Sequence, residues 1–349
     1  MYVLAVAATI WGVLRSGSEI GVAAEEGPVT IIVAARNERS SIGTCVRSIL
    51  AQSHQELSLI VVDDRSDDGT AELAATAAEG DPRLRVLRIP ADGEGGKKRA
   101  LMKGIEASET EILLFTDADC VPGPCWVSGM ASALSPEVAF VAGYAPYHPR
   151  GTLLARLVAA EAGSNAVTAC GLIGLGVPVM CTARNMGYRR SAYDAVGGLG
   201  PVAHVASGDD TLMLQRIARI GRVKYVTDPA THVPSSPPDS VGGWFAQKSR
   251  HLSTLVLFSP PKLLAAVVSR SMDILVFLSV PLVLAGWAGP WIFIAWGVKA
   301  VADFGALWLG LGELGERQLL RVFPVLELVY SYLLVFFVLA GMTRRIQWK

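Results

Sequence analysis

Two groups of aspartates end apolar runs early in the chain. Asp64 directly follows LSLIVVD, and Asp117 and Asp119 end ILLFTDAD with one alanine between them. Carboxylates this close together repel one another unless a cation or hydrogen-bond donors compensate their charge. A simple turn-forming role fits Asp67 and Asp68, farther along the first loop, better than it fits Asp119. The pattern therefore indicates a ligand site at the ends of two strands.

A third acidic pair, Asp209 and Asp210, stands directly before the apolar-periodic segment TLMLQRIARIG. Either acid could cap a helix there, where a carboxylate also suits the helix dipole. Further on, Gln247 and Arg250 are spaced i and i+3, so they share one face of a helix. Aromatic residues such as Trp244 suit a helix in the membrane interface, and a purely anchoring amphipathic helix is the alternative to a functional one.

Short β-rich runs alternate with helical segments from about residue 28 to residue 259. We expect strands at 29–35, 57–63, 84–89 and 111–117, with helices at 40–52, 70–78 and 97–107. Continuous Val, Ile and Leu runs are typical of a parallel sheet covered on both faces. This order predicts an open, doubly wound α/β domain, which binds ligands at the carboxyl ends of its strands. The glycine-rich fingerprints of nicotinamide enzymes and P-loop NTPases are missing from the sequence after the first strand, which disfavours both classes.

Three segments with little or no charge predict contact with a bilayer, in a chain with 51% hydrophobic and 18% charged residues. Residues 1–14 form a short crossing or an interfacial anchor, because a spanning helix needs about 20 residues. Residues 274–298 carry no charge, and a Gly-Pro pair within them predicts a kinked span or a hairpin of two. Residues 323–342 form another span, with Glu327 as the only charge.

Charge and cysteine content exclude several classes of protein. The 349 residues include 31 basic and 31 acidic ones, so the chain lacks the basic excess that a nucleic-acid-binding face needs. The five cysteines include no CxxC pair, which argues against a zinc site or disulfides and for a reducing, cytoplasmic compartment. Charges such as Lys299 and Asp303 allow a small transporter, but without internal repeats we expect them to pair between helices or to lie at helix ends.

The motifs together resemble those of membrane-bound family 2 glycosyltransferases, which have the GT-A fold. The matching segments, in chain order, are VTIIVAARNE (29–38), VDDRSDDGT (62–70), GKKRAL (96–101), TDAD (116–119), TARNMGYRR (182–190), GDD (208–210) and QKSRH (247–251). The resemblance covers about residues 28–260, and the apolar segments around it fit the membrane-bound subset. Each motif is weak by itself, but this many in the same order is a specific signal.

The resemblance implies how a donor would be held. Glu38 and Asp64 would accept hydrogen bonds from the base and ribose of a nucleotide. Asp119, with Asp117, would bind Mg²⁺ or Mn²⁺ through oxygen ligands, and the metal would neutralise the leaving diphosphate.

Further residues are implied around the reacting atoms. Lys97 or Lys98 would add positive charge near the diphosphate, although a solvated helix start explains two lysines equally well. Asn185 lies in a matched segment and is assigned to substrate binding. The second acid of the family's acidic pair is the catalytic base, which points to Asp210, with Asp209 as the competing choice.

The QKSRH segment corresponds to the family's Q-x-x-R-W box. The resemblance places Gln247 near the acceptor and Arg250 on the diphosphate. His251 stands where the family has tryptophan, and this loss of a stacking surface favours a single transfer over the holding of a growing polysaccharide.

We therefore predict a GT-A catalytic domain with N- and C-terminal transmembrane helices. Residues 1–27 would form an anchor and linker, 28–260 the glycosyltransferase domain ending in an interfacial helix, and 261–349 a transmembrane region. The expected reaction is metal-dependent, inverting transfer from a nucleotide-diphosphate sugar, with UDP-sugar the expected donor, to a lipid or glycan acceptor in the membrane. A processive polysaccharide synthase and a catalytically silent nucleotide-sugar-binding membrane subunit are the alternatives. We expect a multi-pass protein of the cell (inner) membrane with a cytoplasmic catalytic domain and no nucleic-acid partner.

Overall fold

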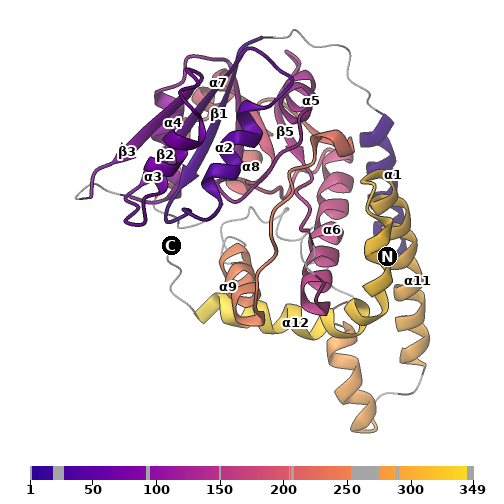
Figure 1. Cartoon of the computed structure of the whole chain (residues 1–349). Helices are drawn as coiled ribbons and strands as arrows, with labels where there is room; N and C mark the ends of the chain where they lie inside the picture. The colour runs from indigo at the N-terminus through magenta and orange to yellow at the C-terminus, as the bar shows by residue number, and fades with distance from the viewer. Residues whose placement is uncertain are drawn as a thin grey trace. The chain divides into compact units, whose positions relative to one another are not determined.

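The computed structural model describes residues 2–18, 27–91, 95–148, 151–203, 205, 208–252, 273, 275–287, 289 and 291–343. The chain divides into two compact units, and Figure 1 labels most of their helices and several of their strands. The sheet unit comprises mainly Ser16–His148 and Met180–Ser236, and the helical unit comprises Met1–Arg15, Pro149–Val179 and Pro237–Ile346. The sequence of the sheet unit is therefore interrupted by a segment of the helical unit.

The sheet unit is built on a seven-stranded sheet with the order β3-β2-β1-β4-β6-β5-β7. Its strands are β1 (Val29–Ala35), β2 (Leu57–Asp64), β3 (Leu84–Ile89), β4 (Ile112–Asp117), β5 (Val138–Gly143), β6 (Met186–Arg189) and β7 (Arg222–Val226). The first four pair in parallel, as the sequence predicts, with Val29 opposite both Leu57 and Ile112. β6 runs antiparallel to β4 and β5, so the sheet as a whole is mixed.

Helices cover both faces of this sheet. They are α2 (Ile42–Leu50), α3 (Thr70–Ala77), α4 (Lys97–Glu106), α5 (Trp126–Ala133), α7 (Arg190–Ala195) and α8 (Thr211–Ile217). Ile31 on β1 is part of the buried cluster formed with α2 and α5, and its neighbour Ile32 points to the opposite face. There a Cβ atom on Gly104 of α4 would lie 2.6 Å from Ile32, so the glycine lets α4 lie close against the sheet.

The helical unit contains the predicted membrane segments. Its helices are α1 (Tyr2–Ser18), α6 (Leu153–Gly174), α9 (Val241–Leu252), Leu275–Leu284, α11 (Ile292–Glu313) and α12 (Phe323–Thr343). The apolar stretch 274–298 does not form one helix, because the helix that ends at Leu284 is followed by a turn in which Gly286 has a φ of +74°. This arrangement favours two helices over a single kinked span.

By length and composition, two of the described helices could cross a membrane, Leu153–Gly174 and Ile292–Glu313. The most apolar window of Leu153–Gly174 is 61% buried, as in a core helix, whereas that of Ile292–Glu313 is only 6% buried. Large apolar side chains such as Ile294 and Val301 are exposed on the second helix. These features hint at membrane association.

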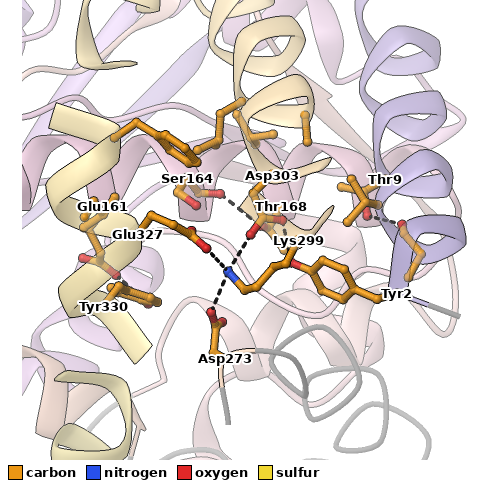
Figure 2. Close-up of a pocket in the computed structure, with 17 residues that line it drawn as sticks. Tyr2, Thr9, Glu161, Ser164, Thr168, Asp273, Lys299, Asp303, Glu327 and Tyr330 are labelled. Atoms are coloured by element: carbon orange, nitrogen blue, oxygen red, sulfur yellow. Dashed lines mark hydrogen bonds and ion pairs between the residues drawn. The ribbon is translucent and has the colours of Figure 1, made fainter. Parts of the chain in front are cut away.

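A cluster of ion pairs lies inside the helical unit (Figure 2). Lys299, which is 2% exposed, lies 3.2 Å from Asp273, 2.7 Å from Asp303 and 2.8 Å from Glu327. The hydroxyl of Tyr2 donates a hydrogen bond to Asp303, and a cavity of about 130 Å³ adjoins the cluster. The charges of these apolar segments therefore pair between helices, as the sequence predicts.

Candidate active site

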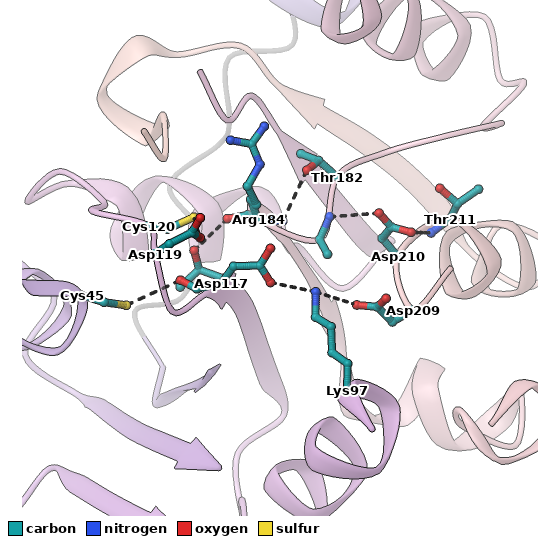
Figure 3. A network of polar contacts seen from close by, with 12 residues as sticks. Cys45, Lys97, Asp117, Asp119, Cys120, Thr182, Arg184, Asp209, Asp210 and Thr211 are labelled. Carbon is teal, nitrogen blue, oxygen red and sulfur yellow. Dashed lines mark hydrogen bonds and ion pairs between the residues drawn. The ribbon is translucent and has the colours of Figure 1, made fainter. Parts of the chain in front are cut away.

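The end of β4 and the segment before β6 meet at one edge of the sheet (Figure 3). β4 ends at Asp117, the next side chain, Ala118, is buried, and Asp119 is exposed. The hydroxyl of Thr116 donates to the carbonyl oxygen of Arg184 at 2.8 Å, which fastens the segment before β6 to β4. The two acids predicted from the sequence therefore lie together, with Arg184 beside them.

The second acid pair lies at the start of α8. Gly208, directly before the pair, has a φ of +82°, a conformation that favours glycine. Asp210 caps the helix, because its carboxylate accepts a hydrogen bond from the backbone N–H of Thr211 at 2.5 Å. Its other oxygen accepts from the backbone N–H of Ala183 at 3.1 Å. The capping role that the sequence allows is present, and the same carboxylate also binds the segment before β6.

Lys97 joins the two acid pairs (Figure 3). Its Nζ atom lies 2.7 Å from Asp117 and 3.1 Å from Asp209, and its side chain is 17% exposed. Lys98 donates to two backbone carbonyl oxygens of the segment before α8. The alternative of a solvated helix start is therefore wrong for both lysines. Burial lowers the pKa of Lys97, but the carboxylates of Asp117 and Asp209 raise it by more, so the ammonium stays charged.

Two carboxylates of the site have raised pKa values. Burial and then the charge of Asp209 raise the pKa of Asp210 to about 6, while backbone N–H groups and the charge of Lys97 oppose this rise. Desolvation by the surrounding protein and then the charge of Asp117 raise the pKa of Asp119, although part of that residue is open to solvent. Both acids would therefore gain from a bound cation or a proton.

Asp64 and Glu38 lie at the ends of the neighbouring strands β2 and β1. Asp64 is fully buried, and its carboxylate accepts from the backbone N–H of Gly96 at 2.8 Å and pairs with Arg65 at 3.0 Å. Glu38 is half-buried and accepts from the hydroxyl of Ser41 at 3.0 Å. Because β1, β2 and β4 are parallel neighbours, these acids lie at the same edge of the sheet as the acids of β4.

Asn185, assigned to substrate binding, has a fully buried side chain. Its amide nitrogen donates to the carbonyl oxygens of Tyr144 at 2.8 Å and Thr231 at 2.9 Å. Its amide oxygen accepts from the indole nitrogen of Trp126 at 2.9 Å. These contacts join three segments beneath the site, so this side chain supports the site from within the protein.

Gln247, Arg250 and His251 lie on α9, which belongs to the helical unit. Gln247 and Arg250 are half-buried, and the side chain of His251 lies outside the described residues. Within its unit, α9 is joined to α6 by Lys248, whose ammonium donates to Glu161 at 2.6 Å. These three predicted residues thus belong to a different unit from the acid pairs.

The sequence did not lead us to assign a role to Arg184. Its guanidinium lies over the ring of Tyr147, 4.1 Å from the ring centroid, and donates to the hydroxyl of Ser235 at 2.6 Å. Both partners are far from Arg184 in sequence, so no local pattern predicts the contact. In the sequence, Arg184 is marked only by its place in the TARNMGYRR segment, which resembles the family motif.

Comparisons with known proteins show what this chain is similar to. The family model described as Glycosyl transferase family 2 matches residues 30–197, just under half of the chain. The glycosyltransferase AglE of Haloferax volcanii is 32% identical over 109 residues, which are 31% of this chain and 35% of that protein. The beta-monoglucosyldiacylglycerol synthase of Trichormus variabilis is 34% identical over 93 residues, 26% of this chain and 20% of that protein. The chain thus matches only about a third or less of the length of these relatives.

A solved structure resembles almost the whole chain. The mannosyltransferase PcManGT from Pyrobaculum calidifontis, in complex with GDP-Man and Mn²⁺, gives a TM-score of 0.59 at 23% identity, covering 93% of this chain and 94% of that chain. At this identity the likeness shows the fold, which is the GT-A fold. Together with the family match, it supports a family 2 glycosyltransferase domain in this chain.

Proposed function

We propose that this chain is a metal-dependent, membrane-associated glycosyltransferase that moves a sugar, with inversion, from a nucleotide-diphosphate donor to a lipid acceptor. The observation that carries the proposal is the pair of acid groups at one sheet edge, with Lys97 in ion-pair contact with Asp117 and Asp209. Such a transfer needs one acidic group that holds a metal and another that takes a proton from the acceptor. The family match supports this reaction class.

Asp117 and Asp119 would hold the metal. Their carboxylate oxygens are the hard ligands that Mg²⁺ and Mn²⁺ prefer, and the raised pKa of Asp119 fits a pair that gains from a nearby cation. The described residues contain no group of three or more His, Cys, Asp or Glu that could hold a metal ion, and Asp117 and Asp119 are the two residues proposed to bind it. A bound metal would neutralise the charge that develops on the leaving diphosphate.

Asp210 would act as the general base. With a pKa raised to about 6, its carboxylate is ionised at neutral pH and still basic enough to accept a proton. The O–H bond of the acceptor breaks and its proton passes to Asp210, while the acceptor oxygen bonds to the anomeric carbon. The bond from that carbon to the diphosphate breaks on the opposite face, which inverts the centre. Asp209, paired with Lys97, is the less available base.

Substrate binding would involve residues from both ends of the proposed catalytic domain, 28–260. Glu38 and Asp64 are proposed to accept hydrogen bonds from the nucleoside, and Lys97 to supply charge near the diphosphate. Of the residues on α9, Gln247 and His251 are proposed to serve the acceptor side, and Arg250 is proposed to bind the diphosphate. The order of the family motifs along the chain supports these assignments.

The proposed location is the cell membrane, with the catalytic domain in the cytoplasm. We retain the division into an anchor and linker (1–27), a catalytic domain (28–260) and a membrane region (261–349). The exposed apolar surface of α11 supports the association with a membrane. The similarity to a beta-monoglucosyldiacylglycerol synthase supports a lipid acceptor.

The test incubates the full chain in lipid nanodiscs with a panel of UDP- and GDP-sugars, detects free nucleotide, and then extracts lipids. We expect one donor to be turned over, with the sugar in the lipid extract. Excess EDTA should abolish turnover, and Mn²⁺ or Mg²⁺ should restore it. Asp119→Ala should be inactive, whereas the exposed control Glu109→Ala should be fully active. Undiminished activity in EDTA would contradict the metal assignment, and a labelled polymer would indicate a processive synthase instead.

A further inference from the structure

We propose that Arg184 binds a phosphate group, as a positive charge that the site keeps for an anionic ligand. The inference rests on the proposed function and adds to it a residue that recognises one of the substrates.

Three segments of the sheet unit hold Arg184 in place. The hydroxyl of Thr116, on β4, fixes its backbone carbonyl. The ring of Tyr147, after β5, lies against one face of the guanidinium, and the hydroxyl of Ser235, after β7, accepts one of its N–H groups. Ser235 is 5% exposed and forms backbone bridges with Tyr147 and Cys120. The guanidinium is therefore positioned before any ligand arrives, which lowers the entropy lost on binding.

The two cations near Asp117 and Asp119 differ in how they are neutralised. Lys97 is paired with two carboxylates, at 2.7 Å and 3.1 Å. For Arg184, no Asp or Glu of the described part of the chain lies within the 4.0 Å of an ion pair, and its side-chain partners are a neutral ring and a neutral hydroxyl. A half-buried guanidinium that no carboxylate contacts directly can take an anion, because its charge is offset only at longer range, by acids such as Asp119 and Asp117.

The position and shape of the Arg184 side chain indicate which kind of anion it binds. Figure 3 shows the guanidinium pointing away from the row formed by Asp117, Lys97 and Asp209. The hydroxyl of Thr116, three residues before Asp119, nevertheless binds the carbonyl oxygen of Arg184, so this residue lies beside the acids proposed to hold the metal. Among the described residues the guanidinium donates one side-chain hydrogen bond, to Ser235, and the planar group carries further N–H donors that match the oxygens of a phosphate. That phosphate is either part of the donor's diphosphate or the head of a phosphorylated lipid acceptor.

The experiment compares probes that differ only in phosphate. Binding to the full chain in detergent micelles is measured by calorimetry for UDP against uridine, GDP against guanosine, and dodecyl phosphate against dodecanol. The variants are Arg184→Gln, Arg184→Lys, and the control Arg85→Gln, an exposed arginine with one contact to a backbone carbonyl. We expect Arg184→Gln to weaken binding of one phosphate-bearing probe by about 10- to 100-fold, the range of a charge-assisted hydrogen bond, with its phosphate-free partner unchanged.

Each outcome decides the inference. A loss confined to UDP or GDP assigns Arg184 to the donor phosphates, and a loss confined to dodecyl phosphate assigns it to an acceptor phosphate. An equal loss for a probe and its phosphate-free partner, or no loss at all, overturns the inference and leaves the proposed function standing. If the wild-type chain binds no phosphate-bearing probe, the proposed function fails as well. If Arg184→Gln does not fold, the decision rests on Arg184→Lys, which keeps the positive charge but not the paired N–H donors of the guanidinium. We expect Arg184→Lys to lower the affinity for the same phosphate-bearing probe by about threefold or more. Unchanged affinity overturns the inference.

Discussion

Asp210 would combine a structural and a chemical role in one carboxylate. Asp210→Asn keeps an oxygen that can accept the hydrogen bond from Thr211, but it removes the acceptor for the N–H of Ala183 and the group that takes the proton. We expect transfer to fall by at least about 100-fold, the low end for loss of a general base, with donor affinity little changed. Donor affinity by calorimetry and the transfer rate are measured on the same preparation. Normal transfer by Asp210→Asn together with an inactive Asp209→Asn would show that the neighbouring acid is the base.

Lys97 should set the pH range in which the base works. A protonated Asp210 cannot accept a proton, so the rate should fall as pH drops through about 6. The charge of Lys97 lowers the pKa of Asp210, so Lys97→Met should move this acid limb to higher pH, whereas Lys97→Arg should leave it near its original position. The rate is measured against pH for the three proteins at saturating donor. Superimposable acid limbs for wild type and Lys97→Met would rule out this coupling.

The site residues that could be predicted are those marked by a local sequence pattern. Asp117 and Asp119 stand out in the sequence because they end an apolar run, and Asp209 and Asp210 because they open a helical segment. The ion pairs of Lys97 join a helix start to two acids far along the chain, and no sequence spacing encodes that distance. The same holds for the contacts that position Arg184, which come from the folding of three separate segments together.

At the scale of elements, α4 depends on a close approach to the sheet. A Cβ atom on Gly104 would lie 2.6 Å from a methyl group of buried Ile32, so Gly104→Ala forces a shift in the core. We expect a loss of about 1–3 kcal/mol, as for other overpacked cores. Gly43→Ala on α2 is the matched control, because its Cβ atom would have no neighbour closer than 3.5 Å. Thermal unfolding of both variants should show a lower Tm for Gly104→Ala alone, and equal Tm values would contradict the packing argument.

The Lys299 cluster should hold the elements of the helical unit together. Lys299→Met leaves buried Asp273 and half-buried Asp303 and Glu327 without their shared cation. Removing one partner of a buried ion pair typically costs about 3–5 kcal/mol, so the variant should melt well below wild type. Lys299→Arg keeps the charge and should recover most of the difference. Melting is followed in detergent at fixed protein concentration, and a Tm for Lys299→Met equal to that of wild type would mean that the cluster adds no stability.

Element types were easier to predict than directions. The strands β1 to β4 follow from unbroken runs of Val, Ile and Leu between turn residues, and their parallel order follows from the helices between them. β6 has only the four residues Met186–Arg189, one of them glycine, and the chain reaches it by way of the helical unit. Neither its antiparallel direction nor its place between β4 and β5 can be predicted from such a short segment.

At the scale of the whole molecule, the sequence places apolar segments at both ends of a matched α/β region, but it does not show how the chain divides. The segment Pro149–Val179 lies within the matched region and yet belongs to the helical unit, together with α9. Its small and apolar residues suit either a core helix or a membrane surface, and only tertiary contacts separate the two. The same chain thus supplies both the acid-bearing sheet and the apolar helices.

This combination leads to a prediction about how the acceptor arrives. Large apolar side chains on α11 are exposed, and α9 carries the residues proposed for the acceptor side, so the acceptor should reach the enzyme by diffusion within the bilayer. The full chain is reconstituted in vesicles with a fixed amount of the acceptor lipid found by the extraction assay. Adding inert phospholipid then dilutes that lipid in the surface without changing its bulk concentration, and the transfer rate should fall in proportion. The enzyme's own stability in the added lipid is controlled by measuring donor hydrolysis in the same vesicles. A transfer rate that ignores surface dilution and follows bulk concentration would show that the acceptor comes from water, and that the membrane serves only as an anchor.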